Sequence, residues 1–363
     1  MATRKKTDTA AEDLLPAPEA NPELIGQDSA ERELLGALRA GRMHHAWLIT
    51  GSKGIGKATL AFRLARFLLR YGRAPDAAAR AISLAVPAED PIARQVASGA
   101  AQDLLVLRLP RDEKTGAEKS VIPVDEIRRL HPFFGLAAGA GGWRIAIVDS
   151  VDELNRNAAN ALLKALEEPP QHSVLLLIAN APGRLLPTIR SRCRKLHLSP
   201  LAPRELAERL PALGEKARLP VLSEADAARL AVLAGGRIGR ALDLWAHDGL
   251  GLARLVDQAL SAWPDLSQRT SGALLDRAKS DYALLSELIV GALRGAARAG
   301  AAGNGNATVT KLAGGAPAAV WAELAAELEA LLMRGEAINM DERMMIGEAL
   351  RRIAGAAARS FAA

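Results

Sequence analysis

The chain has 363 residues, of which 49% are hydrophobic and only 3% aromatic, and its formal net charge is +6. This length suggests two or three domains, the composition favours helices, and the single cysteine excludes an intrachain disulfide and a multi-cysteine zinc site. No apolar run reaches the roughly 18 residues that span a membrane, and the first residues lack the apolar core of a secretory signal. A cytoplasmic protein without membrane contact is therefore expected.

Strand-like and helical segments alternate over the first 200 residues, a pattern typical of an α/β domain. Residues 1–20 are expected to form a disordered tail, and segment 75–119 is expected to be irregular. The predicted helices and strands of this part are a helix over 28–39, a strand over 46–50, a helix over 59–69, a strand over 144–149, a helix over 151–168, and strands over 174–178 and 196–198. After residue 200 the pattern is almost wholly helical, with a Gly-rich flexible loop expected over 300–315.

A glycine-rich segment, residues 51–58, lies between the first predicted strand and the helix that follows it. The pattern G-x-x-x-x-G-K-[ST] wraps backbone N–H groups around phosphates, while its Lys reaches the terminal phosphates and its hydroxyl holds Mg²⁺. The residues that retain this pattern are Gly51, Gly54, Gly56 and Lys57. Ala58 has no hydroxyl, and Thr59 comes one residue late, which rotates its side chain by about 100° on a helix.

The end of the predicted strand over 144–149 is a second site that bears on the hydrolysis of ATP. A P-loop ATPase needs an apolar strand ending in an Asp that supports Mg²⁺, and many place a Glu next to activate water. Asp149 ends such a strand, but Ser150 follows it and cannot act as a carboxylate base. Two independent positions, Ala58 and Ser150, therefore indicate poor turnover of ATP. Binding of ATP or ADP with Mg²⁺ is still possible, because the glycines and Lys57 remain.

Five segments appear in one order along the chain. They are Leu24-Ile25-Gly26-Gln27, Met43-His44-His45-Ala46, the P-loop, the run from Asn160 to Pro170 that ends Leu-Glu-Glu-Pro-Pro, and Ile189-Arg190-Ser191-Arg192-Cys193. Together they resemble the AAA+ clamp-loader subunits of bacterial DNA polymerase III. The resemblance implies a RecA-like α/β P-loop core over 1–198, a small helical lid over 199–248 and a helical collar for oligomerisation over 249–363.

The resemblance also implies roles for single residues. The family's Ser-Arg-Cys segment extends its Arg toward ATP held by a neighbouring subunit, where the guanidinium stabilises charge on the transferred phosphoryl group. By resemblance, Arg192 is that arginine finger; the alternative is a basic residue on a solvated turn. Asn180 lies where the family carries a polar sensor of the γ-phosphate, and Gly239 where motor subunits carry a second sensor Arg. Residues 72–119 lack the four cysteines of the zinc module found in many relatives.

The altered Mg²⁺ positions make the chain resemble the non-hydrolysing member of that assembly and not the gamma/tau motor. The implied complex is a hetero-pentamer with one delta and three gamma/tau subunits, which opens the sliding clamp and places it on primed DNA. The small basic excess fits such an environment and equally fits solvated arginines. Two alternatives are an active P-loop ATPase, with Lys57 and Asp149 sufficient and Thr59 or water serving Mg²⁺, and another AAA+ remodeller such as a helicase loader.

Overall fold

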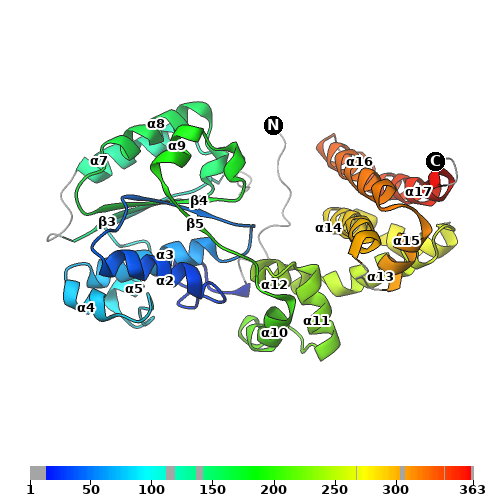
Figure 1. Cartoon of the computed structure of the whole chain (residues 1–363), viewed down its shortest axis with the longest axis horizontal. Coiled ribbons are helices and arrows are strands. Elements are labelled where there is room, and N and C mark those ends of the chain that lie inside the picture. The colour runs from blue at the N-terminus through cyan, green and yellow to red at the C-terminus, as the bar shows by residue number, and fades with distance from the viewer. Residues whose placement is uncertain are drawn as a thin grey trace. The chain divides into compact units, whose positions relative to one another are not determined.

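The computed structural model describes residues 14–111, 119–135, 142–266, 268–302, 307–338 and 340–360. By its internal contacts the chain divides into two compact units, Thr3–Ala246 and His247–Ala363 (Figure 1). The first contains a sheet, its covering helices and a small helical cluster, whereas the described part of the second is helical. No helix among the described residues combines the length and the apolar character needed to cross a bilayer.

The first unit is built on a parallel sheet whose described strands follow the order β2-β3-β4-β1-β5. These strands are β1 (Ala46–Thr50), β2 (Leu104–Leu107), β3 (Arg144–Val148), β4 (Ser173–Ala179) and β5 (Arg194–His197). β1 lies between β4 and β5, with Ala46 opposite Leu175 and Trp47 opposite Arg194. The glycine-rich segment follows β1 directly. This arrangement confirms the predicted RecA-like α/β core.

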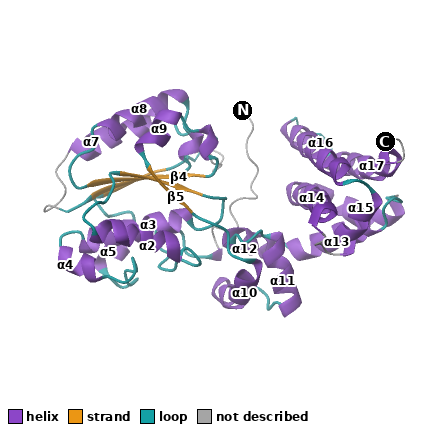
Figure 2. Ribbon diagram, in the orientation of Figure 1, coloured by secondary structure: helices purple, strands orange, loops and turns teal. Residues whose placement is uncertain are grey.

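Alternate residues of the central strands enter two separate cores, one on each face of the sheet. The helices that cover the two faces include α2 (Asp28–Arg39) and α3 (Lys57–Tyr71) on one side and α8 (Arg156–Glu167) and α9 (Pro187–Arg192) on the other. On β1, Trp47 and Ile49 join the core under α2 and α3, whereas Leu48 joins the core under α8 and α9. Figure 2 shows the strands between these two helical layers. Burial on both faces explains why the strands read as continuous apolar runs.

The helix expected over 151–168 begins later than predicted, at Arg156. Ser150 takes up the left-handed backbone conformation, with φ of 63°, which turns the chain before a helix can start. Asn155 then caps α8, because its side-chain oxygen accepts a hydrogen bond from the backbone N–H of Ala158 at 2.8 Å.

The segment expected to be irregular over 75–119 contains regular structure, so that prediction is wrong. It holds α4 (Pro75–Arg80), α5 (Pro91–Ala97) and β2. Each of the two helices begins with a proline, the position where the missing N–H costs nothing. Asp90 caps α5 by accepting from the N–H of Ile92 at 2.8 Å and pairs with Arg70 at 2.7 Å.

The expected N-terminal tail is described only from residue 14, and residues 1–13 lie outside the described part. Arg66 on α3 is 3% exposed and holds the described part of this segment. Its Nη1 donates to the carbonyl of Glu19 at 2.8 Å, and its Nη2 donates to the carbonyl of Asn21 at 2.6 Å. The chain just before α2 is therefore fixed against α3.

The remaining described elements are helical or 3-10 turns. They are η2 (Val151–Glu153), η3 (Pro182–Arg184), α6 (Val124–Arg128), α7 (Leu130–Gly135), α10 (Pro203–Ala217), α11 (Glu224–Leu233), α12 (Ile238–Ala246), α13 (Gly249–Ser261), α14 (Gln268–Ala302), α15 (Ala307–Gly315), α16 (Ala318–Ala337) and α17 (Glu342–Ser360). The second unit has its own core, in which the rings of Trp263 and Trp321 meet edge to face with centroids 5.6 Å apart. The loop expected over 300–315 is instead helical from Ala307 onward, with Leu312 buried.

Candidate functional site

The glycine-rich loop has the backbone shape of a phosphate-binding loop. Gly51, Gly54 and Gly56 have φ of 145°, 78° and 100°, a region that residues with a side chain rarely enter. A Cβ atom at Gly51 would lie 2.7 Å from the carbonyl oxygen of Leu198, so the loop also needs glycine for close packing. These three residues thus keep the conformation that the sequence pattern predicts.

Lys57 begins α3 and is 5% exposed. Its Nζ donates three hydrogen bonds of 2.8 Å each, to the carbonyls of Gly51 and Ser52 and to Oδ1 of Asn180. The structure therefore brings Lys57 and Asn180 together, as the predicted site requires. Phosphate oxygens entering the loop would have to replace these internal acceptors.

Burial lowers the pKa of Lys57 to about 8, because the charged ammonium loses hydration. The negative charges of Asp149 and Asp152 oppose this shift, while Lys53 adds to it. Asp149 follows β3, and its N–H donates to the carbonyl of Leu107 at 2.8 Å. The predicted residues Lys57 and Asp149 therefore interact electrostatically across the edge of the sheet.

Asp152 belongs to the site although the sequence assigned it no role. It lies in η2 and is 9% exposed. Its Oδ1 accepts from the N–H of Asn180 at 3.1 Å, and its Oδ2 accepts from the N–H of Ala181 at 2.7 Å. The carboxylate holds the loop after β4 and so positions Asn180 toward Lys57. Sequence reasoning missed this contact, in which the short acidic turn after β3 binds the backbone of the loop after the neighbouring strand β4.

The residues expected around Mg²⁺ fit a metal less well than those expected around phosphate. Ala58 offers no oxygen ligand, and Thr59 takes no part in the hydrogen bonds that join Lys57, Asn180 and Asp152. The loop, its lysine and Asn180 could hold a nucleotide's phosphates, but the hydroxyl position of the metal is lost.

The helical cluster rests directly on the loop. The N–H of Gly239, near the start of α12, donates to the carbonyl of Gly54 at 2.9 Å. A Cβ atom at Gly239 would lie 3.0 Å from the Cα of Gly54, so this contact leaves little room for a side chain. The flanking arginines are held within the same cluster, since Arg237 donates to the carbonyl of Ala234 and Arg240 pairs with an aspartate one turn on. Close backbone packing against Gly54 therefore fills the space beside Gly239.

Gln27 ties this contact to the core. It is 3% exposed, and its Nε2 donates to the carbonyls of Ser199 at 3.1 Å and Ile55 at 3.4 Å. One of these acceptors lies in the P-loop and the other just before the helical cluster. The motif Leu24 to Gln27, which the sequence singled out without a role, therefore joins the loop to the segment that leads into the helical cluster.

Arg192 ends α9 and lies apart from the hydrogen bonds of Lys57. Its side chain is 38% exposed; Nη2 donates to Oε1 of Glu167 at 2.9 Å, and Nη1 donates to the carbonyl of Thr188 at 3.2 Å. The next residue, Cys193, is buried, and burial raises the pKa of its thiol to about 12. At neutral pH this cysteine is therefore a packing residue, because its thiolate is not formed.

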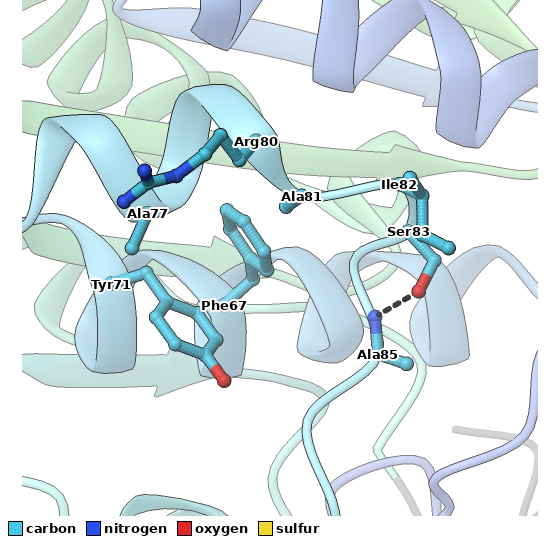
Figure 3. A pocket seen from close by; sticks show the side chains of 8 residues that line it. All are labelled: Phe67, Tyr71, Ala77, Arg80, Ala81, Ile82, Ser83 and Ala85. Carbon is cyan, nitrogen blue, oxygen red and sulfur yellow. Dashed lines mark hydrogen bonds between the residues drawn. The ribbon is translucent and has the colours of Figure 1, made fainter.

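A surface hollow of about 340 Å³ lies elsewhere, between α3 and α4. Figure 3 shows the rings of Phe67 and Tyr71 from α3 on one side and Arg80 and Ile82 around the other. Its lining is largely apolar and contains no acid–base pair. The P-loop and Arg192 are therefore the better candidates for a functional site.

The pKa of Lys57 predicts a pH effect on stability. An unfolded Lys57 titrates near 10.5 but the folded one near 8, so between these values the unfolded chain binds the extra proton and stability rises with pH. We expect the free energy of unfolding to increase from pH 8 to 9 by about 1 kcal/mol more in the wild type than in Lys57→Met. Urea unfolding at both pH values measures this. Any contribution of Cys193 is the same in both proteins and cancels in the comparison. If the free energy of unfolding increased equally in the wild type and in Lys57→Met, the lowered pKa of a buried Lys57 would be contradicted.

Residues 26–202 match the family model described as "DNA polymerase III, delta subunit". DNA polymerase III subunit delta′ of Pseudomonas aeruginosa is 42% identical over 149 residues, which cover 41% of this chain and 41% of that protein. DNA polymerase III subunit tau of Salmonella typhimurium is 29% identical over 277 residues, which cover 76% of this chain and 39% of that protein. The matched segments span about two fifths of the length of these curated relatives.

A solved structure of a DNA polymerase III gamma subunit-related protein from Thermotoga maritima aligns with a TM-score of 0.42 at 17% identity, covering 88% of this chain and 99% of that chain. The similarity to this family rests on the sequence matches. Residues 26–202, which are 177 of the 363 residues of this chain, are therefore similar to the family described as "DNA polymerase III, delta subunit".

Proposed function

We propose that the chain is the delta-prime subunit of a bacterial DNA polymerase III clamp loader and hydrolyses little or no ATP itself. The observation that carries the proposal is the P-loop. It keeps its glycine backbone and buried Lys57, while Ala58 and Ser150 stand at the positions that need a hydroxyl and a carboxylate. The 42% identity to a protein named delta′ supports the same assignment.

The contacts in the site favour a P-loop that keeps a fixed conformation and does not hydrolyse ATP. All three N–H donors of Lys57 are bound to acceptors of the chain, and Gly239 packs on Gly54 where a motor would need an arginine. Hydrolysis depends on groups that stabilise charge as it develops on the transferred phosphoryl group. A subunit without those groups can still keep a defined interface toward a neighbour.

The proposed assembly is a hetero-pentamer with one delta and three gamma/tau subunits. In it this chain supplies Arg192 to the ATP of a neighbouring motor, and the complex loads the sliding clamp onto primed DNA in the cytoplasm. The exposed end of α9 supports this role, since Arg192 is 38% exposed and open to a partner. The second unit, with its separate helical core, would serve as the collar.

The test is the ATPase activity of the purified chain. We expect no turnover above background, and no change in Lys57→Ala, because the metal hydroxyl and the base are both missing. The competing function is an active P-loop ATPase, favoured by the retained Lys57 and Asp149. Turnover on the order of 1 s⁻¹ or more, abolished by Lys57→Ala, would establish that function and reject the one proposed.

A further inference from the structure

We propose that Glu167 is a positioning residue for Arg192, holding the guanidinium in the orientation from which it acts on a neighbour's nucleotide. The proposal rests on the proposed function, in which Arg192 acts in trans. Glu167 is the last residue of α8, and its Oε1 accepts a hydrogen bond from Nη2 of Arg192 at 2.9 Å. The carbonyl of Thr188 accepts from Nη1 at 3.2 Å.

These two contacts fix the plane of the guanidinium and leave part of it free. An arginine has five N–H donors in a rigid fork. Glu167 and Thr188 each take one donor, on different nitrogen atoms, so the remaining donors can still face a partner's phosphate. The side chains of Arg192 and Glu167 are 38% and 50% exposed, which leaves the pair accessible from outside the chain.

The ion pair of Glu167 and Arg192 is expected to contribute little to the stability of the fold. A carboxylate in the last turn of a helix faces the negative end of the helix dipole, so Glu167 is unfavourably placed for α8 itself. Ion pairs as exposed as this one contribute little to folding. Ordering a long, flexible side chain before it meets its target is a more specific effect, because it lowers the entropy lost when the target is bound.

Glu168 provides a matched control. It follows Glu167 in the Leu-Glu-Glu-Pro-Pro segment and is also an exposed carboxylate at the end of α8. The described hydrogen bonds and ion pair of Arg192 involve Glu167 and Thr188 but not Glu168. Replacing Glu168 therefore removes a neighbouring charge while leaving both bonds of the guanidinium in place.

The experiment compares clamp loaders assembled with wild-type, Glu167→Ala, Glu167→Gln, Glu168→Ala, Arg192→Ala and the Glu167→Ala/Arg192→Ala double variant. The kcat and KM of DNA- and clamp-stimulated ATP hydrolysis are measured after the mass of each complex is verified. We expect Glu167→Ala to lower the rate at the affected site by up to about 10²-fold with KM unchanged. Glu167→Gln should lower it less, because its amide oxygen still accepts a hydrogen bond. Glu168→Ala should match the wild type.

The double variant separates positioning from a structural role. If Glu167 acts only through Arg192, the double variant is no slower than Arg192→Ala alone. If Arg192→Ala slows the loader but Glu167→Ala does not, the positioning role is wrong while the proposed function stands. An additive loss in the double variant also overturns it, since Glu167 would then act by another route. If Arg192→Ala has no effect in a verified complex, both the finger and its positioning residue are rejected.

Discussion

Arg192→Ala is expected to lower the ATPase of the assembled clamp loader while leaving the chain folded and in its complex. The side chain is 38% exposed, and its ion pair with Glu167 is also exposed. Replacing such a surface residue usually changes stability by less than about 0.5 kcal/mol. At the neighbour's site, however, loss of an arginine that stabilises the transferred phosphoryl group costs on the order of 10³-fold or more in rate.

The total ATPase should fall by less than this, because in the proposed assembly the other motor sites would keep arginines from their own neighbours. Single-turnover measurements would resolve the slow site from the others. Arg190→Ala is the control, since it removes a positive charge from the same helix, two residues before the motif position. If neither substitution changes DNA-stimulated hydrolysis or clamp loading in a verified complex, Arg192 is a solvated basic residue and not a finger.

Removing the second unit is expected to abolish assembly and to preserve the fold of the first. A chain ending at Ala246 keeps the sheet, both of its cores and the helical cluster, all of which lie within the first unit. The deleted unit has a separate core, closed by Trp263 and Trp321, whose Nε1 atoms donate to the carbonyls of Ile353 and Leu312 at 2.9 Å. Its loss therefore removes one complete folding unit.

Circular dichroism and urea unfolding would show whether the shortened chain folds, and size-exclusion chromatography with delta and gamma/tau would show whether it assembles. We expect a cooperative unfolding transition and no shortened chain in the complex. The full-length chain, mixed under the same conditions, is the control. Recovery of a full complex containing the shortened chain would show that the second unit is not the collar.

The sheet and the P-loop could be predicted because their signals are local. β1, β3 and β4 are continuous apolar runs, and the glycines mark a loop whose backbone needs positive φ. Asn180 is assigned to the same site as Lys57 only through the family resemblance, and the two residues follow the neighbouring strands β4 and β1. The direct contact of 2.8 Å between them agrees with that placement.

The parts that sequence reasoning missed depend on contacts between distant segments. Asp152 bonds the backbone of Asn180, 28 positions away, because the left-handed turn at Ser150 brings η2 back toward the sheet edge. The pairing of Glu167 with Arg192 spans 25 positions and joins two separate motifs. Neither contact leaves a periodic or compositional pattern that could predict it.

Glycine and proline misled the prediction in two places. Segment 75–119, which contains several prolines, is expected to be irregular, yet Pro75 and Pro91 each start a helix. Gly315 suggested a flexible loop, yet it ends α15 against the ring of Trp263, where a Cβ atom would lie 2.0 Å from the nearest ring atom. Gly315 thus allows close packing in the second unit, which the prediction of a flexible loop does not anticipate.

The most direct test of the proposed function is the mass of the complex formed with the delta and gamma/tau subunits of the same organism. The full-length chain is mixed with both, the complex is isolated, and its mass is measured by native mass spectrometry. We predict one species that contains one copy of this chain, one delta and three gamma/tau subunits. A chain that stays alone in that mixture, or that assembles only with copies of itself, would contradict its assignment as a clamp-loader subunit.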